Sequence, residues 1–327
     1  MAGDLKSLRR LGTSELMVSP IGLGCWQFSK GRGLSGGYWA DLGNAEIERI
    51  LAASLAGGIN WFDTAEVYGR GESEKALAKG LAALGKSPGE VVIADKWHPV
   101  LRRAASIPAS IGTRLGNLAP FPIDLYQIHN PLSVSSVAAQ MKAMAGLVRA
   151  GKIRAVGVSN FSRRQMEKAH RALRELGLPL VSNQVRYSLL DRRIERNGVL
   201  AAAKDLGISI IAYSPLAQGL LSGRFHDDPR LVRKHGGFRK FMPAFWSRGL
   251  AKSWPVVEAL RRIAAKHGAT PIQAALNWLI CVHGETVVAI PGASRAGQVE
   301  DFAAATSFAL TDGDQDELDR ASAPFKG

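Results

Sequence analysis

The chain repeats one pattern eight times: a short apolar run, then a segment in which apolar residues recur at helical spacing. The runs cover residues 19–25, 59–63, 91–96, 125–129, 153–159, 181–185, 208–213 and 286–290. Helical spacing is clear, for example, in Val137, Met141, Met144 and Val148. Continuous apolar runs are typical of parallel strands that are buried on both faces. The pattern therefore predicts an α/β fold, a (β/α)8 TIM barrel forming one domain over residues 1–327, rather than an open doubly wound sheet.

With 46% hydrophobic and 21% charged residues, the composition is that of an ordinary globular protein. The chain has two cysteines, Cys25 and Cys281, so no disulfide framework is predicted and reduced thiols are the default. The N-terminus lacks the apolar core of a signal peptide, and no stretch approaches the roughly 20 apolar residues of a membrane span. We therefore expect a cytoplasmic protein with no membrane partner.

The net charge of +14, from 42 basic and 28 acidic residues, raises the question of a nucleic-acid surface. The basic residues are scattered, however, and no run contains four consecutive Lys or Arg. This distribution favours a solvated basic surface over a nucleic-acid partner. Basic residues are in local excess at residues 224–252, which contain eight Lys or Arg but only two acidic residues, Asp227 and Asp228. Gly and Pro interrupt this stretch, so it cannot form one continuous helix.

Ionisable residues end three consecutive runs. They are Asp63, Lys96 and His129, and Tyr68 follows Asp63 in a loop bounded by glycine. In a parallel barrel these strand ends meet on one face. A phenol, with an ordinary pKa of about 10, becomes a useful acid at neutral pH when a nearby cation lowers that pKa. Lys96 is the expected cation, Asp63 its partner, and His129 a donor to a substrate carbonyl. This set suits carbonyl reduction, whereas four unrelated rim residues would be an improbable coincidence.

Carbonyl reduction needs a hydride donor, for which a nicotinamide-binding motif would be the sequence signal. The segment 22–27 begins like the G-x-G-x-x-G fingerprint, but Gln27 replaces its third glycine. A dinucleotide would therefore have to be held in some other way.

Four segments, in order along the chain, resemble signatures of the aldo-keto reductases. They are Phe-Asp-Thr-Ala-Glu-Val-Tyr-Gly at 62–69, Asp-Leu-Tyr-Gln-Ile-His at 124–129, Gly-Lys-Ile-Arg-Ala-Val-Gly-Val-Ser-Asn-Phe at 151–161 and Ile-Pro-Gly-Ala-Ser at 290–294. The resemblance runs from about residue 11 to residue 305. It implies a (β/α)8 barrel with an N-terminal β-hairpin and a long loop after the seventh strand. It also implies NADPH bound without a Rossmann domain, and Asp63, Tyr68, Lys96 and His129 as catalytic residues with Tyr68 as the acid.

The same resemblance implies a set of cofactor contacts, position by position. Ser159, Asn160 and Gln184 would bond the nicotinamide carboxamide, Tyr213 would stack on the ring, Ser214, Leu216, Gln218 and Gly219 would follow the pyrophosphate, and Gly292, Ser294, Arg295, Gln298 and Asp301 would hold the adenosine end. Arg295 can pair with a 2′-phosphate, which favours NADP over NAD. The basic residues 224–252 would lie over this anionic cofactor. Considered alone, Gln184 is equally consistent with a satisfied core amide.

Two residues depart from the family pattern. Phe302 follows Asp301 where the family usually has Asn, and Asp95 precedes Lys96 where a small polar residue is expected. Adjacent strand residues face opposite sides, so Asp95 need not touch the active site.

Aromatic residues near the strand ends bear on the substrate. Trp26, Tyr38, Trp39 and Trp97 follow the first and third runs, and either form an apolar carbonyl pocket or pack the barrel rim. The glycine-rich run 29–37 is typical of a loop.

We expect an enzyme that reduces small aldehydes or ketones with NADPH, reversibly, and that needs no metal. The main alternative is an NADPH-binding regulatory subunit with little turnover, as in the potassium-channel β subunits that this branch resembles. A barrel glycosidase would need two carboxylates beside the cleaved bond, and the chain offers Asp63 and at most Glu66. The sequence sets neither the oligomeric state nor the direction of the reaction.

Overall fold

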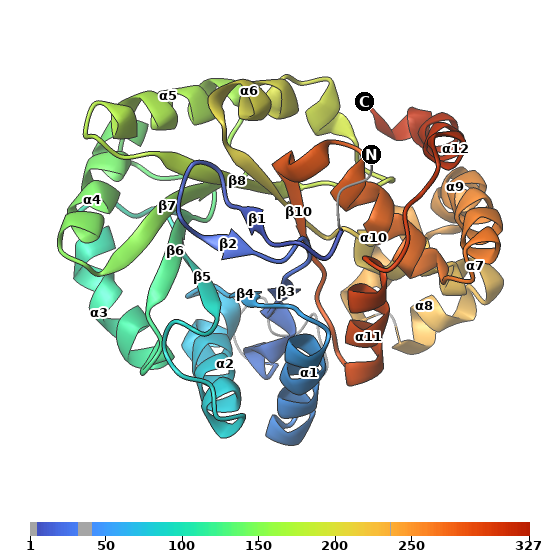
Figure 1. Cartoon of the computed structure of the whole chain (residues 1–327), viewed down its shortest axis with the longest axis horizontal. Coiled ribbons are helices and arrows are strands. Elements are labelled where there is room, and N and C mark those ends of the chain that lie inside the picture. Colours follow the sequence, from blue (N-terminus) through green and yellow to red (C-terminus); the bar gives the residue numbers. More distant parts are fainter. Residues whose placement is uncertain (1–4, 32–40, 236) are drawn as a thin grey trace.

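The structure is a computed structural model that describes residues 5–31, 41–235 and 237–327. Its main sheet has eight parallel strands in the order β3 to β10, surrounded by helices (Figure 1). The strands are β3 Leu23–Gly24, β4 Trp61–Asp63, β5 Val92–Trp97, β6 Ile123–Ile128, β7 Ile153–Ser159, β8 Leu180–Arg186, β9 Ser209–Tyr213 and β10 Val287–Ile290. Parallel bridges from Ile21 to Ala289 and from Gly24 to Gly292 join the two ends of the sheet. The predicted (β/α)8 barrel is confirmed.

A short antiparallel hairpin precedes the barrel, as predicted. It consists of β1, Arg9–Arg10, and β2, Met17–Val18, which lie across the middle of the barrel in Figure 1. Leu11 and Leu16 of this hairpin pack with Trp61 and Val181 in one buried cluster. The hairpin therefore closes the end of the barrel opposite the strand C-termini, because its apolar side chains join those of the barrel interior.

Helices cover the outer face of the sheet. They are α1 Asn44–Ala56, α2 Glu72–Ala83, α3 Ser106–Leu118, α4 Val137–Arg149, α5 Arg163–Arg174, α6 Val199–Leu206, α7 Arg224–Asp227, α8 Arg230–His235, α9 Ser247–Lys266, α10 Pro271–Cys281, α11 Ala296–Ala304 and α12 Asp312–Ser322. Met141 and Met144 of α4 are buried against the strands, as their spacing predicts. Ser162 and Thr270 begin α5 and α10 with complete capping boxes, so local sequence sets these two boundaries. None of the helices that the structure describes is long and apolar enough to cross a membrane.

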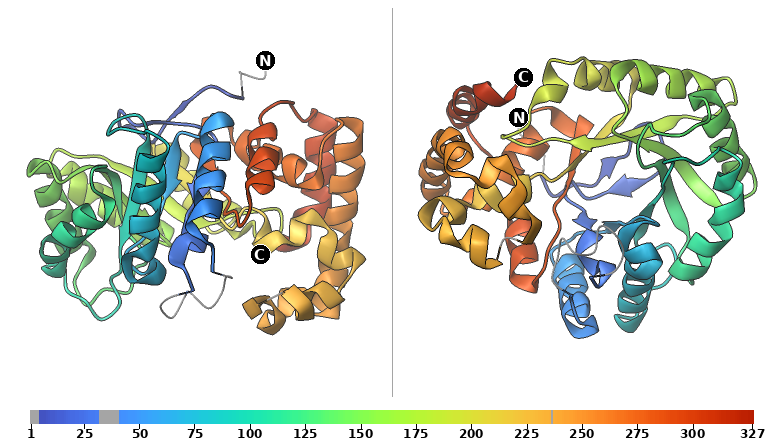
Figure 2. Two further views of the ribbon diagram at one scale, coloured as in Figure 1. Left: turned by 90° about the horizontal axis from the view of Figure 1, so that it is seen from below. Right: turned by 180° about the vertical axis from the view of Figure 1, so that it is seen from behind.

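The segment after β9 is long and breaks into short helices, as the sequence indicated. It contains η5 Ala217–Ser222, α7, α8, η6 Gly237–Phe241 and η7 Pro243–Phe245 before α9 begins. Leu220, Phe225 and Phe245 form a small buried cluster of its own. Figure 2 shows this segment on the flank of the barrel, beside α9. Its fold is therefore held by a local core rather than by a continuous helix.

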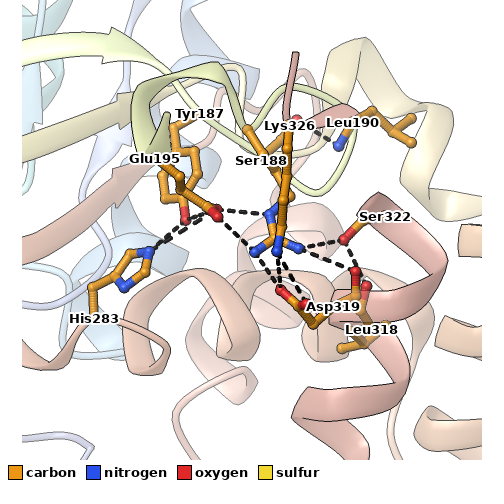
Figure 3. A network of polar contacts seen from close by, with 10 residues as sticks. Tyr187, Ser188, Leu190, Glu195, His283, Leu318, Asp319, Ser322 and Lys326 are labelled. Carbon is orange, nitrogen blue, oxygen red and sulfur yellow. Dashed lines mark hydrogen bonds and ion pairs between the residues drawn. The ribbon is translucent and has the colours of Figure 1, made fainter. Parts of the chain in front are cut away.

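A buried polar network docks the C-terminal segment onto the barrel (Figure 3). The Arg192 guanidinium, only 2% exposed, donates to Glu195 at 2.6 and 2.7 Å and to Asp319 of α12 at 2.7 Å. The Tyr187 hydroxyl, just after β8, donates to Glu195 at 2.7 Å and lies 2.8 Å from Nε2 of His283. Because its charge is paired with two carboxylates, the Arg192 guanidinium can stay buried.

Candidate active site

A buried ion pair forms the base of the site. Asp63 is the last residue of β4, and the Lys96 ammonium on β5 donates to its carboxylate and to the Thr64 carbonyl, the latter at 2.7 Å. The amide nitrogens of Gln127 and Gln184 donate to the other Asp63 oxygen at 3.1 and 2.8 Å. Both oxygens of Asp63 are thus bonded, and Lys96, fully buried, is held in one position.

Tyr68 and His129 lie beside this pair. The Lys96 Nζ is 5.0 Å from the centre of the Tyr68 ring, and the His129 ring meets the Tyr68 ring edge-on at a centroid distance of 5.7 Å. The Trp26 ring stacks with the Tyr68 ring at a centroid distance of 6.0 Å. The structure therefore brings together the four residues that the sequence placed at separate strand ends.

The protonation of these groups differs in one respect from expectation. Burial raises the pKa of Tyr68, and the opposing effect of Lys96 is smaller, so the predicted lowering of this pKa is wrong for this structure. For Lys96, burial favours the neutral amine, but Asp63 and Tyr68 outweigh it and the pKa is raised. Burial, followed by Lys96, moves the pKa of His129 well below its ordinary value. At neutral pH the site therefore holds a protonated phenol, an ammonium and a neutral imidazole.

A cavity of about 1440 Å³ opens from Tyr68 and His129 toward α11. It is lined by all the residues predicted to contact a cofactor: Ser159, Asn160, Gln184, Tyr213, Ser214, Leu216, Gln218, Gly219, Gly292, Ser294, Arg295, Gln298 and Asp301. Ser159, Asn160 and Tyr213 are linked, because Asn160 donates to the Ser159 hydroxyl at 3.0 Å and accepts from the Tyr213 hydroxyl at 2.9 Å. Gln184 lines the cavity, and its amide nitrogen donates to Asp63, so its side chain is at least partly satisfied within the protein.

The aromatic residues predicted near the substrate divide into three cases. Trp26 lines the cavity. Trp97 does not: it is fully buried in the core between strands and helices, and its indole donates to Ser106 of α3 at 3.2 Å. Strand alternation explains this correction, because Lys96 faces the barrel interior and its neighbour must face outward. Tyr38 and Trp39, with most of the run 29–37, lie outside the described residues.

Several cavity residues were not named individually from the sequence. Arg224 and Arg239 line the wall together with Arg295, and both come from the basic stretch 224–252. Burial and Arg224 lower the pKa of Arg239 to about 10, and burial and Arg295 lower that of Arg224. The excess of basic residues in that stretch was the sequence feature that could have identified Arg224 and Arg239. Gln127 was also missed, although a polar residue inside an otherwise apolar run indicates a buried bonding partner.

The family assignment follows from comparison with known proteins. The model of the aldo/keto reductase family matches residues 20–323. This chain belongs to that family. An oxidoreductase of Mycobacterium tuberculosis, described as uncharacterized, is 40% identical to this aldo-keto reductase over 313 residues, 94% of this chain and 91% of the relative. Pyridoxal reductase of Arabidopsis thaliana is 33% identical over 331 residues, covering 96% and 86% of the two chains.

Solved structures agree with this assignment. Glycerol dehydrogenase from Gluconobacter oxydans superimposes with a TM-score of 0.83 at 29% identity, covering 99% of this chain and 97% of the other. A thermostable aldo-keto reductase crystallised with the inhibitor epalrestat has a TM-score of 0.76 at 29% identity, with 96% and 99% coverage. By family, the protein is an oxidoreductase.

Proposed function

We propose that this aldo-keto reductase reduces aldehydes or ketones to alcohols with NADPH, reversibly, and that Tyr68 is the general acid. The observation that carries the proposal is the ion pair of Lys96 and Asp63 beneath Tyr68, with His129 beside it at the cavity. Tyr68 keeps its proton at neutral pH and can give it to the carbonyl oxygen. The ammonium of Lys96 then stabilises the phenolate that remains, and His129 orients the carbonyl.

The lining of the cavity fits a nicotinamide dinucleotide phosphate. Tyr213 offers a flat ring near Asn160, and Arg224, Arg239 and Arg295 place positive charge on the wall. Burial and Arg295 lower the pKa of Arg224, and burial and Arg224 lower that of Arg239, so a bound phosphate would relieve the repulsion between these cations. When bound, the cofactor supplies the hydride that adds to the carbonyl carbon. We propose NADP rather than NAD because this group of cations suits the additional 2′-phosphate.

The substrate side is bounded by aromatic surface, because the Trp26 ring stacks beside Tyr68 at the cavity. Such a wall suits an apolar or aromatic carbonyl compound. Relatives of this chain are named for pyridoxal and glycerol, so we include pyridoxal and glyceraldehyde among the compounds to be tried.

NADPH oxidation should be measured over a panel of aldehydes, ketones, quinones and sugars, and then repeated with NADH. We expect turnover with at least one carbonyl class and a lower Kd for NADPH than for NADH. Tight NADPH binding without oxidation across the panel would instead favour the regulatory-subunit alternative. Failure to bind either nucleotide would refute the proposal.

A further inference from the structure

Glu66 lies between Asp63 and Tyr68 in the loop after β4, and it connects this loop to the end of β5. Its backbone N–H donates to the Lys96 carbonyl at 3.2 Å. Its carboxylate accepts from the backbone N–H of His98 and from Arg102. The His98 ring in turn meets the His129 ring at 5.8 Å. Glu66 is 9% exposed, so these bonds form largely away from water.

A second arginine, Arg114, also pairs with the Glu66 carboxylate. Arg114 of α3 lies 3.5 Å from Glu66 and 3.3 Å from Glu74 of α2, with its side chain 10% exposed. Asn117, also on α3, donates to Glu74 at 2.6 Å. The loop that carries Tyr68 is therefore tied to two helices outside the barrel through a single guanidinium.

A buried acid on the outer face of β5 lies beside this cluster. Asp95 precedes Lys96 and is fully buried, with Glu74, Arg114 and Tyr126 around it. Burial, followed by Glu74, raises the pKa of Asp95, and burial raises that of Glu74. One proton retained by these two carboxyl groups removes a negative charge that would otherwise compete with Glu66 for Arg114.

We propose that Glu66 is a positioning residue for carbonyl reduction, and that Arg114 keeps it in place. Glu66 acts at two points: it fixes the loop from Thr64 to Tyr68 against β5, and it fixes His98 against His129. It touches neither substrate nor cofactor in this scheme. The inference rests on the proposed function, and it differs from that proposal by assigning the alignment of Tyr68 to a carboxylate outside the cavity.

The test is Glu66→Gln, which keeps the shape and can still accept from His98 but removes the charge that attracts the two arginines. We expect kcat to fall about ten- to a hundredfold, because small misplacements of a catalytic group cost that much. KM for the carbonyl and Kd for NADPH should change less than about twofold, since the cavity lining is untouched. Glu167→Gln, which removes the partner of Arg163 on the exposed face of α5, is the matched control and should leave kcat unchanged.

A purely structural role would give a different result. It predicts a lower Tm with an unchanged kcat per folded molecule, where folded molecules are counted by NADPH titration. Arg114→Met should reproduce the loss of kcat, and Arg114→Lys should restore part of it, because an ammonium can still pair with Glu66. These two variants also keep the inference testable if Glu66→Gln does not fold. Wild-type kcat in Glu66→Gln, or in both Arg114 variants, would overturn it.

A measurement without turnover separates this inference from the proposed function. Amide hydrogen exchange at His98 should be faster in Glu66→Gln than in the wild type, because the bond to a charged acceptor is replaced by a weaker one. If the wild type reduces no carbonyl, the proposed function fails while this measurement still decides the local claim. Unchanged exchange at His98 would overturn the positioning role in either case.

Discussion

Asp95→Asn should make the protein more stable, by an amount that grows with pH. In the folded chain Asp95 is fully buried with Glu74, Arg114 and Tyr126 around it, and burial, followed by Glu74, holds its pKa well above 3.8. Above pH 3.8 the unfolded chain releases this proton, whereas the folded chain keeps it until its own higher pKa is reached. Folding therefore takes up a proton across this window, and stability falls as pH rises through it. An amide at this position has no proton to release in this pH range.

The size of the effect follows from the linkage relation. One proton bound on folding changes the free energy of unfolding by about 1.4 kcal/mol for each pH unit. While Asp95 stays protonated in the folded chain, the stability of the variant relative to the wild type should rise by about that amount per unit. If the folded chain keeps this proton up to pH 7, the difference would increase by about 2.7 kcal/mol between pH 5 and pH 7.

Urea unfolding of both proteins at pH 5, 6 and 7 measures this difference, with the midpoints compared at equal m-values. Glu167→Gln on the exposed face of α5 serves as the control, since removing an exposed carboxyl should leave the pH dependence nearly unchanged. If the curves of free energy against pH for Asp95→Asn and the wild type run parallel, Asp95 does not retain its proton in the folded state. The account of a shared proton would then be wrong.

Three further predictions concern other parts of the molecule. Tyr68→Phe should lower carbonyl reduction by orders of magnitude while the NADPH Kd stays within about twofold, and retained activity would exclude Tyr68 as the acid. NADPH affinity should weaken with added salt and in Arg224→Ala, measured by fluorescence titration, whereas salt-independent binding would count against the role of the basic segment. Arg192→Met should lower the free energy of unfolding, measured in urea, by about 3 kcal/mol, because it leaves the partly buried Glu195 without this partner. Arg163→Met removes one partner of an exposed ion pair and should lower the free energy of unfolding far less.

Much of the fold, and the four candidate catalytic residues, could be predicted from the pattern of apolar and polar residues along the chain. Parallel strands buried on both faces are apolar along most of their length. The apolar runs that end at Asp63, Lys96 and His129 could therefore be predicted to be such strands. Parallel strands of one barrel also end on one face, so the sequence alone predicted that these three residues, distant along the chain, lie close together. Adjacent side chains of a strand face opposite sides of the sheet. Because Trp97 follows Lys96 directly, this rule could have placed Trp97 outside the cavity.

Other properties depend on which elements pack together. The sequence shows that Asp95 faces away from Lys96, but its meeting with Glu74 and Arg114 depends on how α2 and α3 lie over β5. The net shift of the Tyr68 pKa is likewise a balance between burial and Lys96, and only the assembled site sets their relative size. The sequence by itself thus determined the barrel and the residue types at its strand ends, because both follow from periodicity along the chain. Tertiary structure decided charge states and the contacts between layers, because desolvation and ion pairing depend on distances between residues that are remote in sequence.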